Sequence, residues 1–263
     1  MTKIALVTNE PPPYRIPVFE RIARAPGVEL RVIFCAQREP NRQWDLPPLE
    51  FDHEFLRERF RTVDGRYIHN NPDVIAALRR FAPDVVVTDG FNPTQLYAFG
   101  YAVAKGKAHV PLTDGTLQSE QALSVVHRIV RRIVYARSGA FLSASVGGTQ
   151  LYESYGVAAQ HCFKSYLCID NDFYRRRSEG VAKRYDLVFC ARMVPEKGPL
   201  FALRVALESA RLLGRKVSIL FVGAGSEEER VREASERYPD LLDVHFHGFA
   251  KQKELPALYA SAR

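Results

Sequence analysis

Short apolar runs alternate with amphipathic segments along the first two thirds of the chain. The runs are continuous rather than alternating in polarity, which is typical of parallel strands covered by helices on both faces. We predict strands at residues 3–9, 29–36, 51–56, 84–90 and 109–115. We predict helices that start at Pro17 and that cover residues 72–81, 94–104 and 119–137. This order predicts an α/β fold whose N-terminal domain, residues 1–169, is Rossmann-like.

A charged, turn-prone segment at residues 170–185 interrupts this alternation and is interpreted as a linker. The pattern then restarts in residues 186–263, which we predict to be a second Rossmann-like domain. Its predicted strands are residues 187–191, 217–222 and 244–247, and its predicted helices are residues 197–213, 226–238 and 252–260. A doubly wound sheet usually has about six strands, so we expect this second domain to be incomplete at Arg263.

The predicted helix at residues 119–137 is amphipathic. Its apolar face, expected to be buried, consists of Ala122, Val125, Val126, Ile129, Val130 and Ile133. Its other face carries Arg128, Arg131 and Arg132. One interpretation of these cations is a solvated outer face. The other is a surface for an anionic lipid or a phosphate-bearing acceptor, and hence a peripheral membrane contact.

Composition limits the classes of partner without selecting one. The chain has 37 Lys and Arg against 30 Asp and Glu, a formal net charge of +7, which favours an anionic partner. No basic-aromatic motif indicates nucleic acid. Neither a membrane-spanning run nor a signal peptide is found, so a cytoplasmic location is expected, with the inner face of the membrane as the refinement. The cysteines and histidines lack metal-ligand spacing, and we expect no metal and no cofactor.

Residues 186–200 combine a short apolar strand, a loop with Arg192 and Lys197, and the start of a helix. Free amide groups and the positive end of a helix dipole favour an anion at such a place, and cations strengthen the site. Gly223 and Gly225 follow the next strand and form a second candidate for holding an anion. The alternative for both is an ordinary strand-to-helix loop.

Polar residues also follow the strands of the first domain. Asn9, Glu10, Asp89 and Asp114 should face one crevice, because ligands of parallel sheets bind beyond the carboxyl ends of the strands. The alternative for each aspartate is a helix cap or turn, which we favour more for Asp89 than for Asp114. No G-x-G-x-x-G follows the first strand, which argues against a nicotinamide site.

Four ordered segments of the second region carry a family resemblance. ARMVPEKGPLFAL, ILFVGAGSEEERV, VHFHGF and LPALYASA, preceded by CIDNDFY with Asp170 and Phe173, resemble the retaining GT-B glycosyltransferases of the family-4 type, glycosyl transferases group 1. The resemblance implies a GT-B-like fold and transfer of a sugar, with retention, from a nucleotide-sugar to an acceptor. The acceptor would be a glycan or a lipid-linked molecule, as in cell envelope polysaccharide biosynthesis.

The resemblance also implies roles for particular residues. Arg192 and Lys197 would bind the donor diphosphate, and the turn with Gly223 and Gly225 would lie beside the nucleotide. Asp114 stands where many members carry a histidine near the sugar, which makes it the candidate catalytic residue. The acceptor-side loop would contain Asn9, Glu10, Tyr14 and Arg15. The family's Glu-x7-Glu segment does not occur, so truncation within the C-terminal domain is expected.

Two other functions stay open. A nucleotide-sugar epimerase would share this architecture but needs a set of acid and base residues that the sequence does not reveal. A non-catalytic sugar-nucleotide-binding protein is the rival from another class. A Glu-x7-Glu segment beyond Arg263 would favour the transferase over the binding protein.

Overall fold

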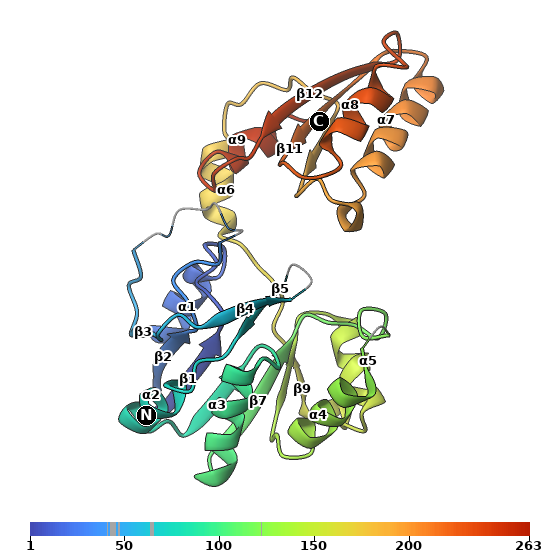
Figure 1. The fold of residues 1–263 in the computed structure, drawn as a ribbon. Coiled ribbons are helices and arrows are strands. Elements are labelled where there is room, and N and C mark those ends of the chain that lie inside the picture. Colours follow the sequence, from blue (N-terminus) through green and yellow to red (C-terminus); the bar gives the residue numbers. More distant parts are fainter. Residues whose placement is uncertain (41, 43–45, 47, 64–65, 122) are drawn as a thin grey trace. The chain divides into compact units, whose positions relative to one another are not determined.

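The computed structural model describes the whole chain except residues 41, 43–45, 47, 64–65 and 122 (Figure 1). The chain forms two compact units, residues 1–169 and residues 170–263. Each has its own sheet and its own core.

The first unit contains a parallel seven-stranded sheet in the order β3-β2-β1-β6-β7-β8-β9. Its strands are β1 (Thr2–Thr8), β2 (Val28–Phe34), β3 (His53–Phe55), β6 (Val85–Thr88), β7 (Ala108–Thr113), β8 (Phe141–Ser143) and β9 (Cys162–Lys164). A separate antiparallel pair consists of β4 (Phe60–Val63) and β5 (Arg66–His69). The chain reverses direction across the sheet at β1, which pairs with both β2 and β6.

Helices follow most of these strands. They are α1 (Ile16–Ala23), α2 (Val74–Phe81), α3 (Pro93–Ala104), α4 (Val125–Tyr135) and α5 (Val146–Ser154), with a 3-10 turn η1 (Ala159–His161). Alternate residues of β1 enter two cores: Ala5 and Val7 pack with α2 and α3, whereas Leu6 packs with Phe19 of α1. The sheet is therefore covered on both faces, which explains the continuous apolar runs.

The second unit has a parallel three-stranded sheet in the order β10-β11-β12. Its elements are α6 (Asn171–Ser178), β10 (Leu187–Cys190), the 3-10 turn η2 (Pro195–Lys197), α7 (Pro199–Leu213), β11 (Val217–Val222), α8 (Glu228–Ser235), β12 (Leu242–Gly248) and α9 (Leu255–Ala260). Leu203 and Leu207 of α7 pack on Ile219 and Phe221 of β11 in its core.

The segment that we expected to be a linker is part of the second unit. Asp170 caps α6, its Oδ1 accepting a hydrogen bond from the Phe173 amide at 3.0 Å. Ser178 Oγ at the other end of α6 donates to the Pro256 carbonyl at 3.2 Å. The Tyr174 and Tyr259 rings lie 6.2 Å apart between α6 and α9. Part of the predicted linker is therefore a helix that contacts α9, although its charged composition indicated a linker.

The orientation of α4 is the main difference from the sequence-based expectation. The helix starts at Val125 rather than at residue 119, and its predicted inner residues Val126, Ile129 and Ile133 are 68%, 51% and 56% exposed. Val134 and Tyr135 are buried instead. Ala122 lies outside the described residues. Across the described part of the chain, no helix has the length and apolarity required to cross a bilayer.

Candidate functional site

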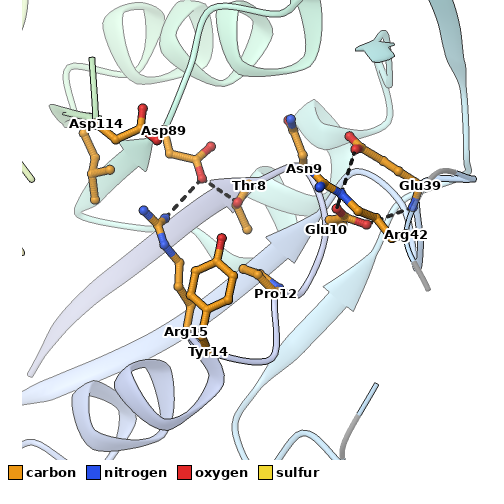
Figure 2. A pocket seen from close by; sticks show the side chains of 11 residues that line it. Thr8, Asn9, Glu10, Pro12, Tyr14, Arg15, Glu39, Arg42, Asp89 and Asp114 are labelled. Atoms are coloured by element: carbon orange, nitrogen blue, oxygen red, sulfur yellow. Dashed lines mark hydrogen bonds and ion pairs between the residues drawn. The ribbon is translucent and has the colours of Figure 1, made fainter. Parts of the chain in front are cut away.

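The first unit has a pocket of about 230 Å³ beyond the carboxyl ends of β1, β6 and β7 (Figure 2). It is lined by Thr8, Asn9, Glu10, Pro12, Tyr14, Arg15, Glu39, Arg42, Asp89, Leu112 and Asp114. All six residues that the sequence singled out at these strand ends and in the loop after β1 are among them. The parallel sheet therefore gathers them in one place, as its topology requires.

Asp89 links the strand ends across the pocket. Its carboxylate accepts hydrogen bonds from Thr8 Oγ1 at 2.5 Å and from Gln95 Nε2 at 2.7 Å. Arg15 forms an ion pair with the same carboxylate at 3.5 Å. Burial nevertheless raises the pKa of Asp89, because loss of hydration outweighs these partners.

The helix-cap alternative, which we favoured more for Asp89 than for Asp114, is wrong for Asp89. The N-cap of α3 is Asn92, whose side chain accepts a hydrogen bond from the Gln95 amide at 3.2 Å. Asn92 Nδ2 also donates to Asn9 Oδ1 at 2.8 Å, which holds the loop after β1 against the start of α3. With the cap supplied by Asn92, the Asp89 side chain is left to face the pocket.

Glu10 is anchored to a neighbouring loop instead of being open to a ligand. Its carboxylate accepts from the Glu39 amide at 2.8 Å and from Arg42 Nε at 2.9 Å (Figure 2). Glu39 in turn lies 3.0 Å from Nε2 of the fully buried His69. Burial raises the pKa of Glu10. This buried network fixes the wall of the pocket.

Asp114 and Tyr14 are the open groups of the pocket. Tyr14 is 39% exposed. Asp114 is exposed, and its carboxylate has no hydrogen bond or ion pair among the described residues. It also lines an adjoining pocket of about 190 Å³, together with Asp89 and Arg131. Asp114 is therefore available to accept a hydrogen bond or a proton from a ligand.

The second unit presents the two predicted cations. Arg192 and Lys197 are both exposed, and their side chains have no ion pair or hydrogen bond within the described part of the chain. Lys197 ends η2, Gly198 adopts a left-handed conformation, and Pro199 then opens α7. The strand, loop and helix start predicted here are thus present, with the helix starting two residues later.

Gly223 and Gly225 have a packing role. Gly223 has a φ of +133°, and a Cβ at this position would lie 2.0 Å from the Ala191 carbonyl oxygen. A Cβ on Gly225 would lie 2.3 Å from the Met193 carbonyl oxygen. Because α8 starts only at Glu228, the glycines do not open that helix as expected. They let two loops touch, and one of these loops carries Arg192.

The three arginines of α4 have different environments. Arg131 has a side chain only 12% exposed, donates from Nε to Glu120 at 2.7 Å and stacks over the Phe91 ring at 4.2 Å. Arg128 and Arg132 are exposed. The expectation that all three cations are solvated is therefore wrong for Arg131, which forms an internal ion pair with Glu120.

Sequence reasoning missed several residues that shape the pocket. Thr8 and Gln95 hold Asp89, and Glu39 with Arg42 holds Glu10. A signal existed for Gln95, which is a polar residue in the first turn of a mostly apolar helix; in the structure it is 2% exposed. Glu39 and Arg42 lie in an irregular loop without periodicity, so no sequence pattern indicated them.

Known proteins resemble this chain in sequence over its second unit and in fold over its whole length. Residues 170–263 match the family Glycosyl transferases group 1. The chain is similar to HepE of Anabaena, solved with UDP and glucose, at 15% identity and a TM-score of 0.62, covering 100% of this chain and 73% of that one. No curated protein sequence matches it significantly.

UDP-GlcNAc 2-epimerases share the same fold. The enzyme of Methanocaldococcus jannaschii is 12% identical, with a TM-score of 0.57 and coverage of 99% of this chain and 77% of that one. That of Neisseria meningitidis, solved with UDP-GlcNAc, is 12% identical, with a TM-score of 0.56 and coverage of 99% and 75%. These similarities confirm the α/β fold with Rossmann-like units.

We expect Gly223→Ala to destabilise the second unit more than Gly214→Ala. Gly214 also has a positive φ, +61°, but a Cβ there meets nothing within 4 Å. Gly214→Ala should cost about 1–2 kcal/mol from backbone strain alone. Gly223→Ala adds the clash with Ala191, so its midpoint in urea should be lower still. Equal midpoints would show that the contact between the two loops is not required.

We expect Asp89→Asn to remove a pH dependence of stability. The pKa of Asp89 is raised in the folded protein, so above about pH 4 the folded state binds more protons than the unfolded state. The free energy of unfolding of the wild type should then decrease, relative to the variant, as the pH rises from about 4 through the raised pKa. Urea unfolding between pH 4 and 8 measures this difference, and parallel curves would contradict the prediction.

Proposed function

We propose that this protein is a glycosyltransferase that moves a sugar from a nucleotide-sugar to an acceptor. The match of residues 170–263 to Glycosyl transferases group 1 carries the proposal. The donor binds on the second unit and the acceptor on the first. The two unpaired cations of the second unit and the pocket with an open carboxylate in the first support this division.

Arg192 and Lys197 bind the donor diphosphate. Both cations stand after β10 at the approach to α7, where the amide groups of a helix start add to the positive field. The same charges stabilise the negative charge that develops on the departing nucleotide, without a metal or another cofactor. UDP is the first nucleotide to test, because HepE was solved with it.

The acceptor occupies the pocket of the first unit. Asn9, Tyr14 and Arg15 are among its lining residues, and Asp114 contacts the reacting sugar or the acceptor hydroxyl. Transfer proceeds with retention, and the leaving phosphate assists the incoming hydroxyl. We propose a glycan or lipid-linked acceptor of the cell envelope and a cytoplasmic site of action at the inner face of the membrane.

A nucleotide-sugar epimerase is the second candidate. The observation in its favour is that Asp89 and Asp114 line the same two pockets, which places two carboxylates close to one ligand site. Burial raises the pKa of Asp89, which favours the protonated carboxyl that a general acid requires. The M. jannaschii and N. meningitidis structures support the same alternative.

We expect UDP to bind this chain and the Arg192→Ala, Lys197→Ala double variant to lose that binding. Removal of two charge-assisted contacts should weaken the complex at least about 10²-fold. Isothermal titration with UDP, GDP and their sugars measures the loss. Lys216→Ala is the control, since Lys216 is an exposed cation just before the amino end of β11, whereas Arg192 and Lys197 follow the carboxyl end of β10.

Each result of this titration has a defined meaning. Binding that is unchanged in the double variant would contradict the proposed diphosphate site. Binding by the wild type without turnover of any sugar would favour a non-catalytic sugar-nucleotide-binding protein.

Asp114→Asn should preserve nucleotide binding and slow turnover about 10²-fold, because the substitution removes a proton acceptor and a charge at the reacting sugar. NMR of UDP-glucose and UDP-GlcNAc in D2O, with a membrane lipid extract as the source of acceptor, follows the reaction. Asp240→Asn, at an exposed position of the second unit, is the control. Release of UDP supports transfer, whereas deuterium at C2 of an intact UDP-sugar would establish the epimerase.

A further inference from the structure

The outward side of α4 is an apolar ridge. Val125, Val126, Ile129 and Ile133 are 69%, 68%, 51% and 56% exposed. Val125, Ile129 and Ile133 are four residues apart, so they form one line along the helix, and Val126 widens this line at its first turn. Branched aliphatic side chains arranged in this way present a continuous strip to the surroundings. We call these four residues the α4 ridge.

The inner contacts of α4 keep the ridge on the outside. Val134 is buried, and the Tyr135 ring packs edge-on against the rings of Phe91 and Tyr152. Arg131 is held by Glu120 and by the face of Phe91. Rotation of the helix to bury the ridge would break these contacts and expose the aromatic side chains. The exposed ridge is thus a consequence of stable packing.

Cations line one flank of the ridge. Arg128 and Arg132 each precede an isoleucine of the ridge, are one helical turn apart and are exposed. Neither forms an ion pair with an acidic side chain in the part of the chain that the structure describes. The sequence of α4, VVHRIVRRIVY, contains no acidic residue. The helix therefore combines an apolar strip with an uncompensated positive edge.

A pocket adjoins the positive edge. Its volume is about 620 Å³, and Arg132, Tyr155 and His161 are among its lining residues. None of the described residues that line it is acidic. A cavity of this size and charge beside the ridge suits an anionic headgroup.

We propose that α4 docks on an anionic membrane surface, with the α4 ridge among the acyl chains and with Arg128 and Arg132 at the headgroup phosphates. A helix with an apolar strip and an arginine-rich edge lies in the plane of the interface and inserts by about 5–10 Å. Anionic lipids provide the charge that the edge lacks. A second copy of this chain would bring the same arginines together, and their repulsion disfavours that occupant.

This inference does not rest on the proposed glycosyl transfer. It requires only the exposed ridge and its cations, and binding to a membrane can be measured without nucleotide or sugar. A failure of membrane binding would therefore leave the nucleotide titration unaffected, and the reverse also holds.

The test is flotation of the full chain with vesicles of neutral phosphatidylcholine and with vesicles that also contain anionic phosphatidylglycerol. We expect binding to the anionic vesicles only. Ile129→Asp with Ile133→Asp should abolish it, and Arg128→Glu with Arg132→Glu should weaken it at least about 10-fold. Arg131 is kept, because its ion pair with Glu120 maintains the fold.

Matched controls separate the ridge from exposure or charge in general. Leu212→Asp changes an 87% exposed leucine of α7, and Arg175→Glu with Arg176→Glu reverses two exposed cations of α6. Both should bind vesicles as the wild type does. Absence of binding by the wild type, or equal binding by the ridge variants, would overturn the proposal. A wild-type dimer that the aspartate variants convert to a monomer, without vesicle binding, would instead assign the ridge to self-association.

Discussion

Burial of a parallel sheet on both faces is the constraint on which the first unit depends. Helices cover each side of β1 and its neighbours, so the interior of the sheet is apolar and polar side chains gather where the strands end. Thr8, Asp89 and Asp114 lie at three such ends, and the reversal of strand order at β1 brings these ends together. The chemistry of the pocket follows from the topology, because the carboxyl ends of neighbouring parallel strands open onto one crevice.

In the second unit, backbone contacts instead of side chains arrange the loops where the strands end. Two loops at the carboxyl ends of β10 and β11 touch through Gly223 and Gly225, whose missing Cβ atoms leave room for the Ala191 and Met193 carbonyls. The amide of Met193 donates to the Ala224 carbonyl at 2.9 Å, which joins the two loops. Arg192 lies between these fixed points. Under the proposed function, holding the loop in place reduces the conformational freedom that Arg192 would lose on binding the donor diphosphate.

The helix α4 shows how inner contacts can decide the orientation of an amphipathic segment. The ion pair of Arg131 with Glu120, its stacking on Phe91 and the burial of Val134 and Tyr135 leave the aliphatic side chains of the helix on the outside. The pocket of the first unit and the α4 ridge are connected through this choice, since Arg131 and Glu120 also line the cavity beside Asp114. The proposed substrate site and the proposed docking surface would then lie on different sides of α4.

Periodicity and turn residues alone determined the α/β class, the parallel strands and the division near residue 170, because apolar runs and their spacing are local properties. They also indicated Asn9, Glu10, Asp114, Arg192 and Lys197, since polar groups at strand ends follow from strand assignment. Only the tertiary structure decided that Asp89 joins Thr8, Arg15 and Gln95, that Glu10 is tied to Glu39, and which side of α4 faces outward. Those outcomes depend on partners distant in sequence. In α4, they depend on the fact that Arg131, and not Ile129 or Ile133, has partners on the inner side of the helix.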